Sequence, residues 1–258
     1  MPSVNSEASN HFILQDAFEE SLRIGRTLLA EKTSDGSIVK VISDALERLG
    51  QICLDRGMLE EARAKHEESL GILRRVHGEK HPDVAGCFQN IANVLTKQGN
   101  IGEALKMQTK AVKLMRRTLG EDHQEVAANY FNIGNSHTKL GNHAEGLEMY
   151  EKSIAVFARA LGVDCSESAM VYLNMSGCKI MAGDLAGALE SVREAVRLFN
   201  KHGVNNAMSQ GAKEQLKRLE IEVCRRSGGS AGGGGWVAAA VALAAVVVMV
   251  VCLRRRKA

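Results

Sequence analysis

The residues with the clearest potential for chemistry are two histidines, His77 and His81. They stand four positions apart, which is the spacing of two metal ligands on one face of a helix. Gly78 and Pro82 would interrupt a helix at this point, and no third ligand stands beside the pair. We therefore interpret the segment as a linker whose polar groups satisfy helix ends, and we expect no metal site.

Other patterns that could support catalysis are incomplete. The six cysteines form no CxxC pair and no regular spacing with histidine, so neither a zinc module nor a disulfide framework is expected. Glu67 follows His66 without completing an HExxH motif, and neither a GxSxG motif nor a kinase motif set occurs. We expect no enzymatic activity, no cofactor and no small-molecule substrate.

The composition of the chain favours helices. Two prolines among 258 residues, with aromatic residues at 4%, argue against a β-sandwich or barrel of this length. Four of the 33 basic residues lie at 254–257, which leaves 29 basic and 30 acidic residues in 1–253, a net charge of −1. This balance does not favour nucleic-acid binding, so we expect no nucleic-acid partner.

The sequence repeats itself with a period of 42 residues in four gap-free copies. Aligned columns are Leu46, Phe88, Tyr130 and Tyr172 (large apolar), Gly57, Gly99, Gly141 and Gly183, and Ala62, Ala104, Gly146 and Ala188 (small). Within each copy, apolar and small residues recur at helical spacing, stop at the glycine and then resume. Each copy is therefore predicted to be two helices joined by a glycine-terminated turn, with the large column buried.

The segment ERLGQICLDRGMLEEARAKHEESL (47–70) and its three successors resemble tetratricopeptide repeats (TPRs). The segments LGEDH and HGEKHPDV between copies resemble those of kinesin light chain repeats, and FNIGNSHTKLGN is also similar to repeats of spindle-orientation adaptors. The sequence departs from the family at His66 and Gln108, where an aromatic residue is usual, and at Gly146, where alanine is usual. The resemblance implies an all-α, right-handed superhelical solenoid of helix-turn-helix repeats.

A repeat array exposes its apolar face unless its ends are capped, and both ends offer a capping helix. Phe18, Leu22 and Leu29 share one helical side, as do Leu216, Leu219 and Val223 near the other end. The predicted organisation is a flexible N-terminus (1–9), an N-terminal capping helix and linker (10–42), four TPRs (43–84, 85–126, 127–168 and 169–206), a C-terminal capping helix (207–226), a Gly/Ser linker (227–235), a transmembrane helix (236–253) and a basic tail (254–258).

The transmembrane prediction rests on 18 uncharged and mostly apolar residues, 236–253, which would form a helix of about 27 Å. Trp236 and the basic residues 254–257 are suitable flanks. The first twenty residues lack a signal-peptide pattern, so we expect a tail anchor with the repeats facing the cytosol.

The short basic tail and the Ala/Val-rich span resemble anchors of organelle outer membranes of mitochondrial type more than those of the endoplasmic reticulum. The positive-inside rule would instead place the C-terminus in the cytosol, and we give it less weight because the span ends the chain.

The resemblance also implies that the first helices of the repeats line a concave groove for a protein or an extended peptide. Matching the family's groove-facing positions gives Gln51, Asn90, Asn93, Lys97, Asn132, Asn135, Lys139 and Asn174, with Thr96 and Thr138 towards the rim. An amide carries both a donor and an acceptor, so a ladder of asparagines could hold a peptide backbone. The alternative is that these asparagines are exposed helix surface or form hydrogen bonds within the protein.

The groove differs from that of chaperone-binding TPR proteins, where lysines hold a terminal carboxylate. Glu47, Gln89 and Phe131 stand at those positions, and Asp44, Glu47 and Asp55 make the first repeat acidic. An acidic C-terminal peptide would be repelled there. We predict a membrane-tethered TPR adaptor or scaffold; the alternative is a structural subunit of a permanent membrane-associated complex.

Overall fold

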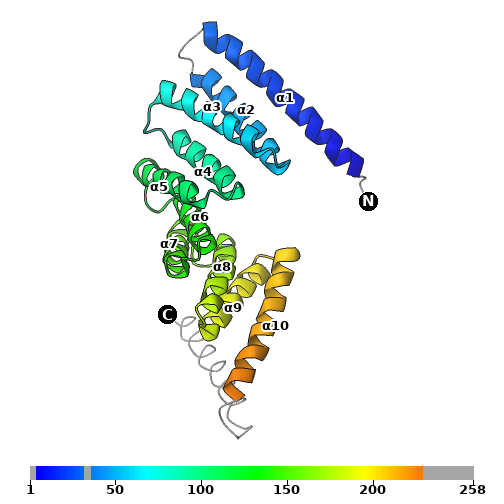
Figure 1. Ribbon diagram of the computed structural model, residues 1–258, viewed down its shortest axis with the longest axis vertical. Coiled ribbons are helices and arrows are strands. Elements are labelled where there is room, and N and C mark those ends of the chain that lie inside the picture. The colour runs from blue at the N-terminus through cyan, green and yellow to red at the C-terminus, as the bar shows by residue number, and fades with distance from the viewer. Residues whose placement is uncertain (1–3, 32–35, 229–258) are drawn as a thin grey trace. The chain divides into compact units, whose positions relative to one another are not determined.

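The computed structural model describes residues 4–31 and 36–228, and all regular secondary structure in these ranges is helical (Figure 1). The helices are α1 (Val4–Glu31), α2 (Gly36–Asp55), α3 (Leu59–His77), α4 (Pro82–Lys97), α5 (Ile101–Thr118), α6 (Gln124–Lys139), α7 (His143–Leu161), α8 (Glu167–Met181), α9 (Leu185–Lys201) and α10 (Ala207–Gly228). They form two compact units, one up to Val171 and the other from Tyr172, so the division falls within α8. The all-α prediction is confirmed for the described residues.

The first unit is a stack of helices in chain order. Helix α2 packs against α3, α4 against α5, and α6 against α7, while contacts of α3 with α4 and of α5 with α6 join successive pairs. Helix α1 packs against α2 at the start of the stack. In the second unit, α10 packs against α9. The first unit is therefore a TPR-like solenoid, in which each element contacts its neighbours in the sequence.

The turn inside each helix pair contains the glycine that the 42-residue pattern singles out. The backbone φ angle is 76° at Gly57, 83° at Gly99, 81° at Gly141 and 80° at Gly183. In each turn the N–H of the next residue donates to a carbonyl five residues before it, as from Met58 to Cys53 at 2.9 Å. This is the hydrogen bond of a Schellman motif, whose left-handed residue is glycine because a Cβ is disfavoured there. The predicted glycine-terminated turn is confirmed.

Histidine side chains cap the N-termini of α4 and α6, each of which is the first helix of its pair. The Nδ1 atom of His81 accepts a hydrogen bond from the N–H of Asp83 at 3.3 Å, and Nδ1 of His123 accepts one from Glu125 at 3.2 Å. The imidazole rings of His77 and His81 stack with their centroids 4.5 Å apart. The prediction that this linker's polar groups satisfy helix ends is therefore confirmed at His81.

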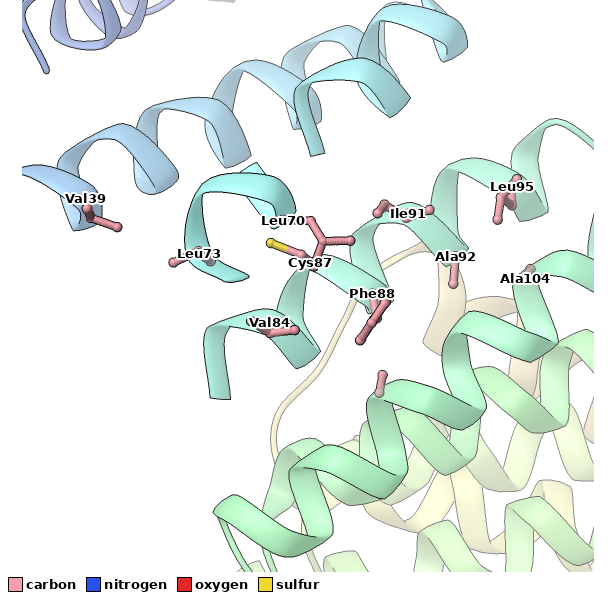
Figure 2. Close-up of a cluster of buried hydrophobic side chains, with 11 residues drawn as sticks. Val39, Leu70, Leu73, Val84, Cys87, Phe88, Ile91, Ala92, Leu95 and Ala104 are labelled. Atoms are coloured by element: carbon pink, nitrogen blue, oxygen red, sulfur yellow. The ribbon is translucent and has the colours of Figure 1, made fainter. Parts of the chain in front are cut away.

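A buried apolar cluster joins α2 to α5 (Figure 2). Its members are Val39 of α2, Leu70 and Leu73 of α3, Val84, Cys87, Phe88, Ile91, Ala92 and Leu95 of α4, and Ala104 and Ala111 of α5. Helix α4 supplies more than half of these side chains because it lies between α3 and α5. Alanine at the crossing with α5 allows close approach, and the larger side chains fill the space around it.

The burial predicted for the large apolar column is observed for only two of its four residues. Leu46 and Phe88 are buried, but Tyr130 and Tyr172 are half-buried, so the prediction that these two tyrosines are buried is wrong. The phenol of Tyr130 interacts with the guanidinium of Arg116, a partner that is itself exposed. The largest fully buried side chain among the described residues is instead Tyr150, which is 1% exposed.

The ends of the array differ from the expected boundaries. Helix α1 begins at Val4, within the segment predicted to be flexible, and α2 begins at Gly36, before the expected repeat start at residue 43. Leu22 is buried, and Phe18 and Leu29 pack with it against α2. Leu219 of α10 is buried against α9, beside Leu216 and Val223. Helix α10 extends two residues beyond 226, to Gly228.

The predicted membrane span (236–253) and basic tail (254–258) lie outside the described residues. Between Val4 and Gly228, apart from the undescribed 32–35, no helix has the length and apolar character needed to cross a membrane.

Candidate functional site

The structure distributes the predicted groove residues over the first helix of each pair. Seven of them lie in the first unit, while Asn174, on α8, belongs to the second unit. They are Gln51 on α2, Asn90, Asn93 and Lys97 on α4, and Asn132, Asn135 and Lys139 on α6. The asparagines are half-buried, whereas the glutamine and the two lysines are exposed. The half-buried amides are the groups whose partners decide between a binding role and a structural one.

A cleft between α2 and α4 contains one of the predicted residues, Asn90. The cleft has a volume of about 430 Å³ and is also lined by residues of α3. The amide Nδ2 of Asn90 donates to Oε1 of Glu47 at 3.4 Å, so this asparagine of α4 is joined to α2. The neighbouring helix pairs therefore meet here through polar side chains as well as through the buried cluster.

Asn135 has a structural role inside the third helix pair. Its Oδ1 accepts a hydrogen bond of 2.7 Å from the hydroxyl group of Tyr150 on α7. The hydroxyl of Thr138 lies 3.3 Å from the same Tyr150 oxygen and donates to the carbonyl of Gly134 at 2.9 Å. The oxygen of the Asn135 amide is thus engaged within the protein, which is the alternative role left open for these asparagines.

Three further predicted residues make local contacts. Gln51 donates to Oδ1 of Asp55 at 2.8 Å, and Thr96 donates to the carbonyl of Ala92 at 2.8 Å. The ammonium of Lys97 donates at 3.4 Å to the carbonyl of Leu54, in the last turn of α2, where a cation is favoured by the helix dipole.

Asn93 and Asn132 differ from their neighbours. Among the residues that the structure describes, neither side chain forms a hydrogen bond, and both are half-buried. Their amides therefore keep both donor and acceptor available for a ligand. They lie on α4 and α6, the first helices of consecutive pairs.

The cleft between α2 and α4 is also acidic. Asp44, Glu47, Asp83 and Glu125 line it, against a single cation, Lys40. The sequence indicated Asp44 and Glu47 but not the other two. An offset of 42 residues places Asp83 and Glu125 in one column, and that signal could have identified them.

A buried histidine lies at the inner side of this cleft. His66 of α3 is 3% exposed and forms no hydrogen bond with any other described residue. Burial lowers its pKa from 6.5 to about 4, because the charged imidazolium would lose its hydration. The ring is therefore neutral at pH 7, with one nitrogen donor and one nitrogen acceptor. In the sequence, His66 stood out as a departure from an aromatic position and as part of an incomplete HExxH motif, but not as a binding residue.

The described residues include no group of three or more His, Cys, Asp or Glu side chains that could hold a metal ion. The acidic side chains and the imidazole that line the cleft can form hydrogen bonds and attract a cation.

The family of the chain follows from its sequence. The tetratricopeptide repeat model matches residues 41–117, 85–139 and 125–201, which together cover more than half of the chain, so the chain belongs to the tetratricopeptide repeat family. No curated protein sequence matches it significantly.

Solved structures show the same fold at low sequence identity. BtubC (BKLC) from P. vanneervenii is 15% identical with a TM-score of 0.66, over 87% of this chain and 94% of that one. A putative kinesin light chain from Podosopora anserina with nearly identical TPR-like repeats is 17% identical with a TM-score of 0.60, over 71% and 88%. MamA is 14% identical with a TM-score of 0.52, over 80% and 99%. The chain is thus similar in structure to kinesin light chain-like TPR proteins.

Proposed function

We propose that this TPR protein is an adaptor that holds a partner protein, or an extended segment of one, against the first helices of its helix pairs. The observation that carries the proposal is the pair of half-buried amides of Asn93 and Asn132, which have no side-chain partner among the described residues. An unpaired amide at the surface can exchange water for a peptide N–H or C=O without breaking an internal hydrogen bond.

The partner-binding test compares two pairs of amide substitutions. In Asn93→Ala with Asn132→Ala, each change should weaken partner binding by about 1 to 2 kcal/mol without altering the helical signal or the melting temperature. In Asn200→Ala with Gln210→Ala, two exposed amides of the second unit are removed, and binding should stay unchanged. Asn135 is unsuitable for this test because its loss would also break the hydrogen bond from Tyr150.

The measurement is a quantitative pull-down from a cell extract with the immobilised full chain in a mild non-ionic detergent. Specific bands should decrease for the α4/α6 variant and persist for the control. Equal retention by both variants would show that binding occurs on another surface.

The proposal includes a membrane tether. The support is the sequence of 236–253, with its 18 uncharged residues, Trp236 at one edge and basic residues 254–257 at the other. The outer membrane of an organelle, of mitochondrial type, is favoured over the endoplasmic reticulum, with the repeats in the cytosol. A fluorescent fusion at the N-terminus, which leaves 236–258 free, tests this location by imaging.

A second function, a structural subunit of a permanent complex, is favoured by an apolar groove between α1 and α2. Ile24, Leu28 and Val41 are 45%, 42% and 50% exposed there, around a hollow of about 260 Å³. Permanent interfaces are more apolar than transient ones. In a mild non-ionic detergent that shields 236–253, an obligate subunit should still self-associate or aggregate when purified alone, whereas an adaptor should remain monodisperse in size-exclusion chromatography.

A further inference from the structure

The cleft between α2 and α4 has an excess of negative charge that the protein does not neutralise. Among the described residues, Asp44 and Glu125 take part in no ion pair, and Glu47 accepts only the weak hydrogen bond from Asn90. Asp83 lies 3.6 Å from Nδ1 of His81. With a single lysine in the lining, the cleft holds several exposed carboxylates that attract a cation and repel an anion.

A second and independent feature is the unpartnered imidazole of His66, which is nearly fully buried yet lines the same cleft. Polar side chains at the matching position of the next two helix pairs are satisfied inside the protein. Gln108 accepts a hydrogen bond from Ser136 at 2.9 Å, and the Tyr150 hydroxyl donates to Asn135 at 2.7 Å.

His66 lacks both of these partners for reasons that are visible in the sequence. The residue one repeat before Ser136 is Val94, whose buried side chain cannot form a hydrogen bond. Tyr150 donates to Asn135, and the residue that corresponds to Asn135 in the repeat of His66 is Gln51, which donates to Asp55 instead. Asn93 corresponds to Asn135 in the intervening repeat, that of Gln108. The ring nitrogens therefore have no internal partner in the described structure.

We propose that this cleft, which we call the α2/α4 cleft, binds a lysine or arginine side chain from a basic segment of the partner protein. The inference rests on the proposed adaptor function and gives the chemistry of its partner. The cationic head lies among Asp44, Glu47, Asp83 and Glu125, and one of its N–H groups donates to a ring nitrogen of His66. A volume of about 430 Å³ accommodates a long side chain, and charge complementarity selects a basic over an acidic segment.

A peptide series tests the charge preference with the full chain in a neutral detergent. The probe is a fluorescent ten-residue peptide of alternating lysine and serine. Matched peptides carry acetyl-lysine or glutamate in place of lysine. By fluorescence anisotropy, the lysine peptide should bind at least about ten-fold more tightly than either control, and its affinity should fall as salt is raised. Equal binding of the three peptides, or no binding of the lysine peptide, overturns the proposal.

Two double variants of equal charge change test the location. Asp44→Asn with Glu47→Gln removes two carboxylates from the α2/α4 cleft, and Glu103→Gln with Glu145→Gln removes two exposed carboxylates from the first turns of α5 and α7. The cleft variant should weaken lysine-peptide binding about ten-fold or more, and the control should change it less than about two-fold. Equal losses would show attraction by overall charge and would overturn the site.

The variant His66→Phe tests the imidazole, because it keeps an aromatic ring against Gly50 and removes both nitrogens. Lysine-peptide affinity should fall about three- to ten-fold while circular dichroism at pH 7 is retained. Unchanged affinity overturns the role of His66.

The outcomes also separate this inference from the proposed function. If the Asn93/Asn132 variant loses partner proteins but the lysine peptide does not bind, the adaptor function stands and the cationic partner is wrong. If the lysine peptide depends on Asp44 and Glu47 but the asparagine variant keeps its partners, the cleft stands and the asparagine groove is wrong.

Discussion

The aromatic ring of Tyr150 lies against the backbone of Gly134, so closely that a Cβ built on Gly134 would stand 2.6 Å from Cε1 of the ring. The same relationship joins Gly50 to His66, with 2.5 Å between such a Cβ and Cε1 of the imidazole. In the second repeat, the matching residues are Ala92 and Gln108. A ring on the second helix thus accompanies glycine on the first helix, because the ring occupies the space of a Cβ.

We expect Gly134→Ala to lower the free energy of unfolding by up to about 2 kcal/mol. Overpacking a well-packed site costs about 1 to 3 kcal/mol, and the better helix propensity of alanine offsets about 1 kcal/mol. The Tyr150 ring is rigid, 1% exposed and bound to Asn135, so it cannot move aside easily. Thermal and urea unfolding would measure the loss.

The matched control is Gly71→Ala in the interior of α3, where a Cβ would meet no atom within 4 Å. This change should stabilise the protein by about 1 kcal/mol. In Gly134→Ala with Tyr150→Gln, which copies the pair at Ala92 and Gln108, the total loss should be smaller than the sum of the single losses. Strict additivity would contradict the steric relationship.

Tyr150 should be more important for stability than Tyr130. Tyr150→Ala removes a fully buried ring and its hydrogen bond, at a cost of about 3 to 5 kcal/mol, whereas Tyr130→Ala removes a half-buried ring and should cost about 1 to 2 kcal/mol. Melting of the two variants under identical conditions compares them. A larger loss for Tyr130 would place the helix register differently from the structure.

His66 makes stability depend on pH below neutrality. Its pKa is lowered from 6.5 to about 4 by burial, so the unfolded chain binds more protons than the folded one between these values. Stability should therefore be independent of this group above pH 6.5 and should decrease as the pH falls towards 4, by on the order of 3 kcal/mol.

Unfolding of wild type and His66→Phe between pH 4 and 7.5 would measure this contribution. Because phenylalanine does not titrate, the variant should lose less stability on acidification. Parallel pH profiles for the two proteins would show that His66 is not the group responsible.

The apolar segment 236–253 should make the chain an integral membrane protein. Alkaline carbonate extraction of membranes should leave the full chain in the pellet, because 18 uncharged residues can span the hydrocarbon core as a helix. A variant without 236–253 should appear in the supernatant. Release of the full chain by carbonate would disprove the tether.

The fold of this protein was predictable from sequence because its signals are local and repeated. A positive-φ glycine after each first helix and apolar residues at helical spacing act within one helix pair, and the period of 42 residues copies them along the chain. The pairs α2/α3, α4/α5 and α6/α7 follow from this pattern alone. The acidity of the first repeat was visible in Asp44 and Glu47 for the same reason.

Only the tertiary structure decided which members of a column are buried and which polar groups have partners. Tyr130 on α6 and Tyr150 on α7 each belong to a pattern of apolar residues at helical spacing. Whether each ring is buried depends on which neighbouring helix covers its face. Asn93 and Asn135 occupy one column, yet only the Asn135 side chain has a partner among the described residues, the Tyr150 hydroxyl. The residue that corresponds to Tyr150 in the repeat of Asn93 is Gln108. Gln108 accepts a hydrogen bond from the Ser136 hydroxyl, but Val94 stands at the corresponding position for His66, so the imidazole has no such partner. Such differences arise from the pairing of side chains between helices, which periodicity within one helix cannot specify.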